Sequence, residues 1–169
     1  MKKILAVDDD EAIRTLLRDE LTDEGYQVIL ASNARDALKI VENEPLDLVI
    51  LDIRMPGMDG LELQRKIREV DPETIVIIMT GYASVETAVE ALKDGAYDYI
   101  TKPFDPDDLA RVIRKALEHR RIKEENIRLR ESLEEIQGVE LVGQSPPMQK
   151  VLEIVRTVAP TDTTVLITG

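Results

Sequence analysis

Carboxylate, hydroxyl and amine side chains stand in this sequence directly after short hydrophobic runs that are typical of buried β-strands. The residues in these positions are Asp8, Asp9 and Asp10 after the first run, Asp52 after the third, Thr80 and Gly81 after the fourth, and Thr101 and Lys102 after the fifth. In an open parallel sheet the carboxyl ends of the strands meet at one edge, and ligands bind there. We therefore expect these residues, far apart in the chain, to form one site.

The residue types at this predicted site indicate its chemistry. Converging carboxylates disfavour one another's charged form unless a cation compensates, and Mg²⁺ prefers oxygen ligands from one or two carboxylates, a backbone carbonyl and water. Lys102 adds a fixed positive charge that can pair with an anion, and Thr80 adds a hydroxyl donor. The set contains neither histidine nor an evident general base. It favours a site that holds a phosphoryl group on a carboxylate and acts by positioning and charge neutralisation.

Each of these residues also has an ordinary structural explanation. An aspartate after a strand is often the N-cap of the next helix, and we assign that role to Asp10. Thr80 taken alone is typical of a turn, and Lys102 taken alone is typical of a solvated surface. Because all of them fall at strand ends, we favour the functional interpretation for Asp8, Asp9, Asp52, Thr80 and Lys102.

The elements that must position this site alternate along the first hundred residues. The hydrophobic runs cover residues 4–7, 28–31, 48–51, 75–79 and 97–100, and the stretches between them have helical periodicity. Strands that alternate with helices predict a doubly wound α/β domain with a parallel sheet. The central runs are continuously apolar, as expected for strands that helices cover on both faces.

The pattern changes after Pro103. Residues 105–108 read Asp-Pro-Asp-Asp, which is typical of a helix start, and neither Gly nor Pro interrupts the chain from there to Gln137. We expect one helix of roughly 45 Å. A further αβ stub then consists of a strand at 139–142, a helix over about 146–158, and a strand at 163–168. This stub is too short for a domain and resembles the opening of one.

Composition excludes several classes of protein. Hydrophobic residues form 43% of the 169, too many for a disordered chain. Without cysteine there is no disulfide or thiolate metal site, and a single histidine, His119, argues against zinc. The net charge is −12, and the sequence lacks the clusters of Lys and Arg that bind nucleic acids. No apolar run is long enough to span a membrane. We expect a soluble, cytoplasmic protein that binds neither nucleic acid nor membrane directly.

Four motifs strongly resemble the receiver domain of two-component response regulators, over about residues 1–120. They are Val-Asp-Asp-Asp at 7–10, Leu-Asp-Ile-Arg-Met-Pro-Gly-Met-Asp-Gly at 51–60, Met-Thr-Gly at 79–81, and Tyr-Ile-Thr-Lys-Pro-Phe at 99–104. The resemblance implies a flavodoxin-like fold with five parallel strands in the order 2-1-3-4-5. It also implies a sensor histidine kinase as the partner that donates the phosphoryl group.

The resemblance assigns a role to each motif residue. Asp52 is expected to be the phosphoacceptor. Mg²⁺ is expected to bind Asp9, Asp52 and the Arg54 carbonyl, with Asp8 assisting through water. The remaining expected roles are phosphate binding by Thr80 next to the small Gly81, an inward switch of Tyr99, pairing of Lys102 with a phosphate oxygen, and a cis peptide bond before Pro103. For Phe104 we favour simple packing.

The tail carries a second resemblance. Residues 141–149 and 158–169 are similar to the start of the ATPase domain of activators that remodel RNA polymerase carrying sigma-54. Gly169 matches the first glycine of the phosphate-binding loop G-x-x-x-x-G-K-[ST]. We therefore expect three parts, at 1–120, 105–138 and 139–169, no ATPase activity in this chain, and RNA polymerase with sigma-54 as a partner of a full-length form only.

Spacing in the linker helix predicts a parallel homodimer. The seam steps by 4, 3, 4 and 3 through Ile122, Asn126, Leu129, Leu133 and Ile136, which is a heptad pattern with Asn126 at an a position. Flanking charges would pair across the dimer, Glu118 with Lys123 and Glu125 with Arg130. The alternative is a solvated helix with an apolar stripe that lies on its own domain.

Two other functions remain open at this point. One is a stand-alone receiver whose tail serves dimerisation or docking. The other, more remote, is a flavodoxin-like module that binds nucleotides. Such a module needs Ser, Thr and Gly after the first strand to hold phosphate, whereas the triplet Asp8-Asp9-Asp10 would repel it.

Overall fold

A computed structural model of the chain describes residues 1–81, 85–137 and 145–158. The chain divides into two compact units, residues 1–124 and residues 125–169. Three parts of the predicted stub, the strands at 139–142 and 163–168 and Gly169, lie outside the described residues. The helix expected at about 146–158 is present as α6, Pro146–Val158.

The first unit is built on a sheet of five parallel strands. These are β1 (Lys3–Val7), β2 (Gln27–Ala31), β3 (Leu48–Asp52), β4 (Ile75–Thr80) and β5 (Asp98–Thr101). Their order is β2-β1-β3-β4-β5, and each neighbouring pair is parallel. The predicted fold class and strand order are confirmed.

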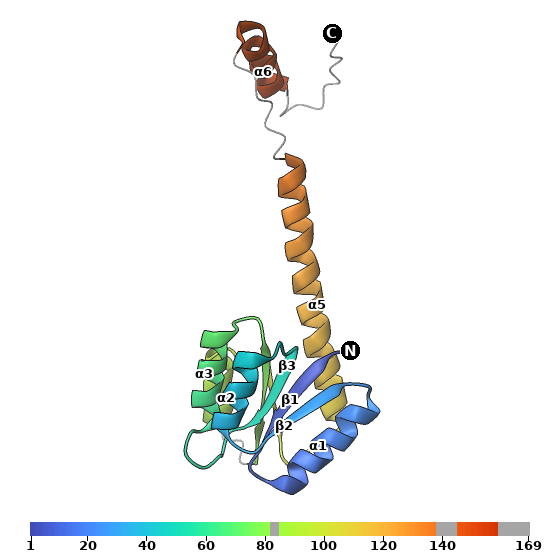
Figure 1. Cartoon of the computed structure of the whole chain (residues 1–169), viewed down its shortest axis with the longest axis vertical. Helices are drawn as coiled ribbons and strands as arrows, with labels where there is room; N and C mark the ends of the chain where they lie inside the picture. The colour runs from blue at the N-terminus through green and yellow to red at the C-terminus, as the bar shows by residue number, and fades with distance from the viewer. Residues whose placement is uncertain (82–84, 138–144, 159–169) are drawn as a thin grey trace. The chain divides into compact units, whose positions relative to one another are not determined.

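Helices connect the strands, and local capping explains where several of them begin. They are α1 (Glu11–Asp23), α2 (Ala34–Asn43), α3 (Gly60–Val70), α4 (Val85–Lys93) and α5 (Pro106–Gln137). Asp10, Asn33 and Asp59 cap the first three, each side chain accepting a backbone N–H of the first turn. In Figure 1, α2 and α3 lie to one side of the strands and α1 to the other.

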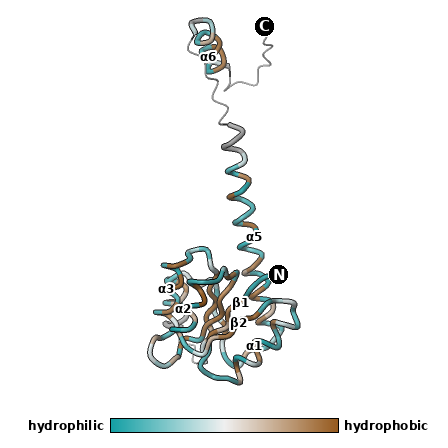
Figure 2. Tube along the Cα trace, in the orientation of Figure 1, coloured by the Kyte–Doolittle hydropathy of each residue, from teal (hydrophilic) through white to brown (hydrophobic). Residues whose placement is uncertain are grey.

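The sheet separates two hydrophobic cores. On one face, Leu5, Val49 and Ile78 pack with residues of α2 and α3. On the other face, Ile50 and Ile77 pack with residues of α1 and of the first turns of α5. Alternate side chains of one strand thus enter opposite cores, and all five residues of β3 are buried. The strands are accordingly hydrophobic in Figure 2, and each fully buried Leu or Ile stabilises the fold by about 1.5–3 kcal/mol.

The long helix predicted after Pro103 is present as α5, Pro106–Gln137, and Gly138, its predicted stop, lies outside the described residues. Asp105 accepts the backbone N–H of Asp107 at 2.8 Å, which caps its first turn. Further along, Arg120 donates to the carbonyls of Leu46 and Asp47 at 2.8 and 2.9 Å. These bonds fix this part of α5 to the loop that precedes β3. Across the described parts of the chain, no helix is long and apolar enough to cross a membrane.

Asp47 ties the beginning of β3 to the beginning of β1. Its carboxylate accepts Lys2 Nζ and the backbone N–H of Lys3, both at 2.8 Å. Burial by itself would raise the pKa of Asp47, but the bonds from Lys2 and Lys3 more than offset it and leave the pKa lowered. A carboxyl whose pKa is lowered by folding adds stability above its unfolded pKa and loses it in acid.

We predict that Asp47→Asn destabilises the chain by about 1–2 kcal/mol at pH 7, because two charge-assisted hydrogen bonds weaken. The difference from the wild type should shrink as the pH falls below about 4, where the wild-type carboxyl takes up a proton. Urea unfolding between pH 3 and pH 7 measures it. Asp19→Asn, in the exposed pair with Arg18, is the control and should change stability little. An Asp47 effect that is constant across this range would contradict the prediction.

Candidate functional site

The carboxyl ends of four strands align at one edge of the sheet. The register brings together the last residues of β1, β3, β4 and β5. The opposed pairs are Val7 with Leu51, Asp52 with Met79, and Thr80 with Thr101. Asp8 and Lys102 follow directly on these strands. The structure therefore confirms that the residues after the hydrophobic runs meet at one edge.

Lys102 joins the two buried carboxylates of this edge. Its Nζ lies 2.5 Å from Asp8 Oδ2 and 2.6 Å from Asp52 Oδ1. The side chains of Asp8 and Asp52 are 1% and 7% exposed, and that of Lys102 is 18% exposed. Buried charges are tolerated only when they are paired, so one ammonium group stabilises two carboxylates that would otherwise repel each other.

The same contacts shift the pKa values of Asp52 and Lys102. Burial raises the pKa of Asp52, and the nearby Asp8 carboxylate adds to the rise, whereas Lys102 and the Arg54 backbone N–H oppose it. Burial also opposes the charge on Lys102, but the hydrogen bonds to Asp52 and Asp8 outweigh burial and raise the pKa of Lys102. The lysine therefore stays charged at neutral pH.

Asp8 and Asp10 divide their roles as the sequence suggested. The second oxygen of Asp8, Oδ1, accepts the backbone N–H of Asp10 at 2.9 Å. Asp10 itself accepts the backbone N–H of Ala12 at 2.8 Å and caps α1. The assignment of Asp10 to capping, not to ligation, is consistent with this geometry, and Asp8 is left facing Lys102.

The donors at this edge fit a divalent cation of the magnesium type. Asp8 and Asp52 carry one negative charge more than Lys102 neutralises, and Asp9 and Arg54 lie beside them with exposed side chains. Oxygen donors with surplus negative charge are what Mg²⁺ binds. Within residues 1–81, 85–137 and 145–158, however, no three acidic or histidine side chains converge as a metal cluster. Asp9 would have to join the other two.

Thr80 and Gly81 lie at the same edge of the sheet, at the end of β4. Thr80 is buried at the end of β4, and its carbonyl accepts the backbone N–H of Lys102 at 2.8 Å. Gly81 is exposed, and a Cβ atom added to it would meet no atom of the described residues within 4 Å. The edge is thus open to solvent beside Thr80, whose role in phosphate binding stays a prediction.

The two aromatic residues near the edge differ in burial. Phe104 packs against the second core, as we favoured, and the peptide bond between Lys102 and Pro103 is cis, as the resemblance implied. Tyr99 is 38% exposed. The inward position of the Tyr99 ring that the resemblance implied is therefore not the one seen here, and its switch role stays a prediction.

Gly60 is a positioning residue that the sequence analysis missed. A Cβ atom at this first residue of α3 would lie 2.3 Å from the Asp52 carbonyl oxygen and 2.7 Å from Ile53 Cα. The Gly60 N–H donates to the Ile53 carbonyl at 2.8 Å. Only glycine allows the start of α3 to approach the end of β3 this closely. The Asp-Gly pair at 59–60 is the end of the motif at 51–60, but the motif does not reveal what the glycine packs against.

Arg14 is a second residue that the sequence analysis missed. It lies on α1, and its Nη1 donates to the carbonyl oxygens of Asp8 and Asp9 at 2.8 and 2.9 Å. The signal in the sequence was the position of Arg14, in the first turns of the helix that follows the triplet Asp8-Asp9-Asp10. From there its side chain can reach back to the loop before the helix.

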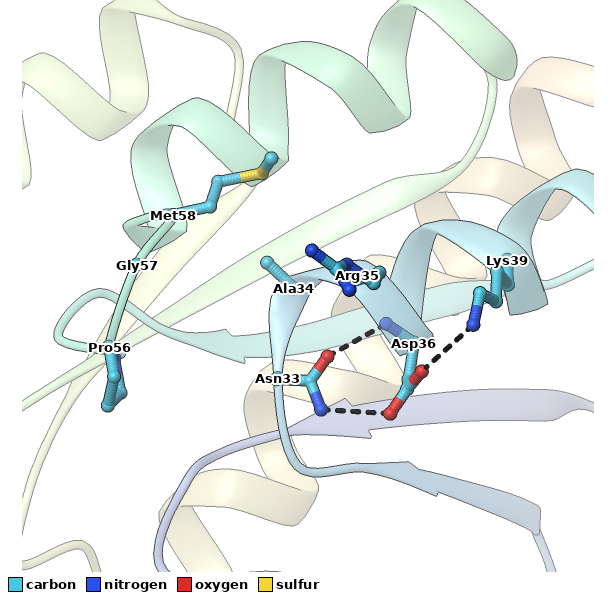
Figure 3. Close-up of a pocket in the computed structure, with 8 residues that line it drawn as sticks. All are labelled: Asn33, Ala34, Arg35, Asp36, Lys39, Pro56, Gly57 and Met58. Atoms are coloured by element: carbon cyan, nitrogen blue, oxygen red, sulfur yellow. Dashed lines mark hydrogen bonds and ion pairs between the residues drawn. The ribbon is translucent and has the colours of Figure 1, made fainter.

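A pocket of about 600 Å³ lies between the start of α2 and the loop at 56–58 (Figure 3). Its polar groups are mainly those that cap α2: Asn33 accepts the Asp36 N–H at 2.9 Å and donates to the Asp36 carboxylate at 2.8 Å. The bond from Asn33 is the main cause of the lowered pKa of Asp36. None of Asp8, Asp52 and Lys102 lines this pocket. It is therefore distinct from the site that these three residues form, which we call the carboxylate edge.

Comparison with known proteins places the chain in a family. The model of the response regulator receiver domain matches residues 4–114. Transcriptional regulatory protein ZraR of Klebsiella oxytoca is 45% identical over 98% of this chain and 37% of its own length. The C4-dicarboxylate transport transcriptional regulatory protein DctD of Rhizobium meliloti is 40% identical over 98% and 36%. The chain thus spans little more than a third of these relatives.

Solved structures agree with the sequence comparison. A CheY-like receiver domain protein from Methanospirillum hungatei JF-1 has 41% identity and a TM-score of 0.71, with 73% of this chain and 98% of that chain covered. NtrX from Brucella abortus has 39% identity and a TM-score of 0.74, with 95% and 35% covered. The family model and the similar solved structures agree with the fold described above. The chain belongs to the response regulator receiver domain family.

Proposed function

We propose that this chain accepts a phosphoryl group on Asp52 from the phosphohistidine of a sensor histidine kinase. The observation that supports this most directly is Lys102, which holds Asp52 and Asp8 together at the carboxyl edge of the sheet. An Asp52 oxygen would attack phosphorus as the phosphorus–nitrogen bond to the histidine breaks, which leaves an acyl phosphate and a free imidazole. A carboxylate nucleophile needs no general base, in keeping with the absence of histidine from this edge.

Charge neutralisation is the main task of the surrounding groups. Mg²⁺ bound by Asp9, Asp52 and the Arg54 carbonyl, with Asp8 assisting through water, would supply positive charge to the phosphate oxygens. Lys102, already charged beside Asp52, would pair with one phosphate oxygen once the Asp52 carboxylate is phosphorylated. The Thr80 hydroxyl would donate to another. Because the edge is open beside Gly81, water can reach the acyl phosphate, and we expect slow self-dephosphorylation.

We further propose that the receiver controls a transcriptional activator of the sigma-54 type. The curated relatives are named as transcriptional regulators and align with nearly the whole chain, and residues 139–169 resemble the start of an activator ATPase domain. In this proposal α5 links the receiver to its output, and RNA polymerase with sigma-54 is a partner of a longer form only. A stand-alone receiver with a docking tail is the alternative within the same class.

The linker is proposed to form a parallel homodimer. Ile122 and Leu129 are 54% and 58% exposed on α5, so the chain alone leaves them uncovered. Ile127, 45% exposed, lies off the predicted seam. Two of the predicted flanking charges bond within the chain: Glu118 to Arg121 at 2.9 Å and Lys123 to Glu73 at 2.7 Å. These bonds would have to rearrange in a dimer, and we base the proposal on the apolar seam alone.

We predict that this chain takes up one hydroxylamine-sensitive phosphoryl group from acetyl phosphate in the presence of Mg²⁺. Asp52→Asn should abolish the uptake because the attacking oxygen is lost, and Asp9→Ala should slow it by weakening Mg²⁺ binding. Asp10→Asn is the matched control, since asparagine also caps helices, and should stay within about twofold of the wild type. Intact-mass spectrometry measures uptake. Labelling of Asp52→Asn at the wild-type rate would refute the assignment.

We propose, and predict, that this chain alone hydrolyses no ATP. Its 169 residues contain no Gly-Lys pair, and the phosphate-binding loop of this ATPase class requires one. ATP should bind no more tightly than about 1 mM, as calorimetry would show. Measurements on the wild type and on Asp52→Asn in parallel separate nucleotide binding from effects of Mg²⁺ at the carboxylate edge. Saturable binding in the micromolar range would contradict this prediction.

We predict that Leu129→Asp raises the dissociation constant of the dimer about tenfold or more, because a buried charge replaces a seam leucine. Ile127→Asp introduces the same charge two residues away, off the seam, and should leave association nearly unchanged. Asn126→Val should tighten association but relax the choice of oligomer. Analytical ultracentrifugation at micromolar concentration measures each. A monomeric wild type, phosphorylated or not, would disprove the proposal.

A further inference from the structure

We propose that Arg14 is a positioning residue for the Mg²⁺ ligands of the phosphoacceptor site. The inference deepens the proposed function and rests on it. Arg14 lies one turn into α1, and a single nitrogen, Nη1, donates to two successive carbonyl oxygens: to Asp8 at 2.8 Å and to Asp9 at 2.9 Å. It therefore holds the backbone of the two residues that carry the acidic side chains.

The two aspartates depend on Arg14 to different degrees. Asp8 is held in several other ways: its backbone N–H donates to the Ala31 carbonyl at 3.2 Å, and its carboxylate binds Lys102 and the Asp10 N–H. Within the described part of the chain, Asp9 has one hydrogen bond, the bond from Arg14 to its carbonyl. The same peptide unit carries the Asp10 N–H, which Asp8 Oδ1 accepts at 2.9 Å. Arg14 and Asp8 therefore hold the orientation of this peptide together, and Arg14 supplies the bond to its carbonyl side.

Charge and position predict opposite effects for the loss of Arg14. A guanidinium close to the metal site repels a divalent cation, so if Arg14 acted only as a charge, its removal would tighten Mg²⁺ binding. If Arg14 acts by holding the loop, its removal lets Asp9 sample other orientations and weakens Mg²⁺ binding. Loss of a group that orients metal ligands typically costs 10–100-fold in affinity. The sign of the change therefore distinguishes the two roles.

The test measures Mg²⁺ dissociation constants of the unphosphorylated full chain by calorimetry. We expect Arg14→Gln to raise the constant about tenfold. Arg14→Lys, which keeps the charge but lacks the planar fork, should cause a smaller rise. Arg18→Gln is the matched control, one turn further along α1 in an exposed pair with Asp19, and should change nothing. At saturating Mg²⁺, the rate of uptake from acetyl phosphate should return to near the wild-type value for each Arg14 variant.

The outcomes separate this inference from the proposed function. A wild type that binds Mg²⁺ and takes up the label, together with an unchanged or tighter constant for Arg14→Gln, would overturn the positioning role alone. A wild type that takes up no label would overturn the proposed function instead. Urea unfolding of each variant measures any loss of stability, and if Arg14→Gln does not fold, the constant for Arg14→Lys decides: an unchanged value overturns the role and a raised value supports it.

Discussion

The carboxylate edge depends on one ammonium group placed between two buried carboxylates. Without Lys102, Asp8 and Asp52 would be like charges out of water, a state that proteins avoid by pairing or by taking up a proton. With it, the two carboxylates lie beside one opposite charge and together carry one formal negative charge more than it neutralises. The pairing therefore holds the two carboxylates in place at this edge of the sheet, and their formal charge favours a cation beside them.

The parallel sheet brings these charged residues together although they lie far apart in the sequence. Asp8 and Lys102 are separated by 94 positions, yet β1, β3, β4 and β5 end at the same edge because right-handed crossovers keep every strand pointing the same way. Helices on both faces bury the strands, and the two cores hold the strand ends in register. Fold and site are thus consequences of the same topology.

How far the sequence predicts this structure depends on how local each feature is. Strand ends, the capping role of Asp10 and the length of α5 follow from hydrophobic runs and turn chemistry, and the structure has them. Contacts that join distant segments leave no such pattern. Neither the close approach of Gly60 to the Asp52 carbonyl nor the bonds of Arg14 to the loop could be read from spacing alone. The exposure of the Tyr99 ring is likewise set by three-dimensional packing, which the spacing of the motif does not specify.

Strand β3, which ends at Asp52, is fastened at both of its ends by lysine–carboxylate pairs. Lys2 binds Asp47 just before β3 begins, and Lys102 binds Asp52 where β3 finishes. A strand that is buried on both faces cannot slide by one residue, because every side chain would enter the wrong core. A shift of register in this strand is therefore strongly disfavoured. Under the proposed function, new charge on Asp52 would act on the loops that leave this edge of the sheet, with the sheet as the fixed frame behind them.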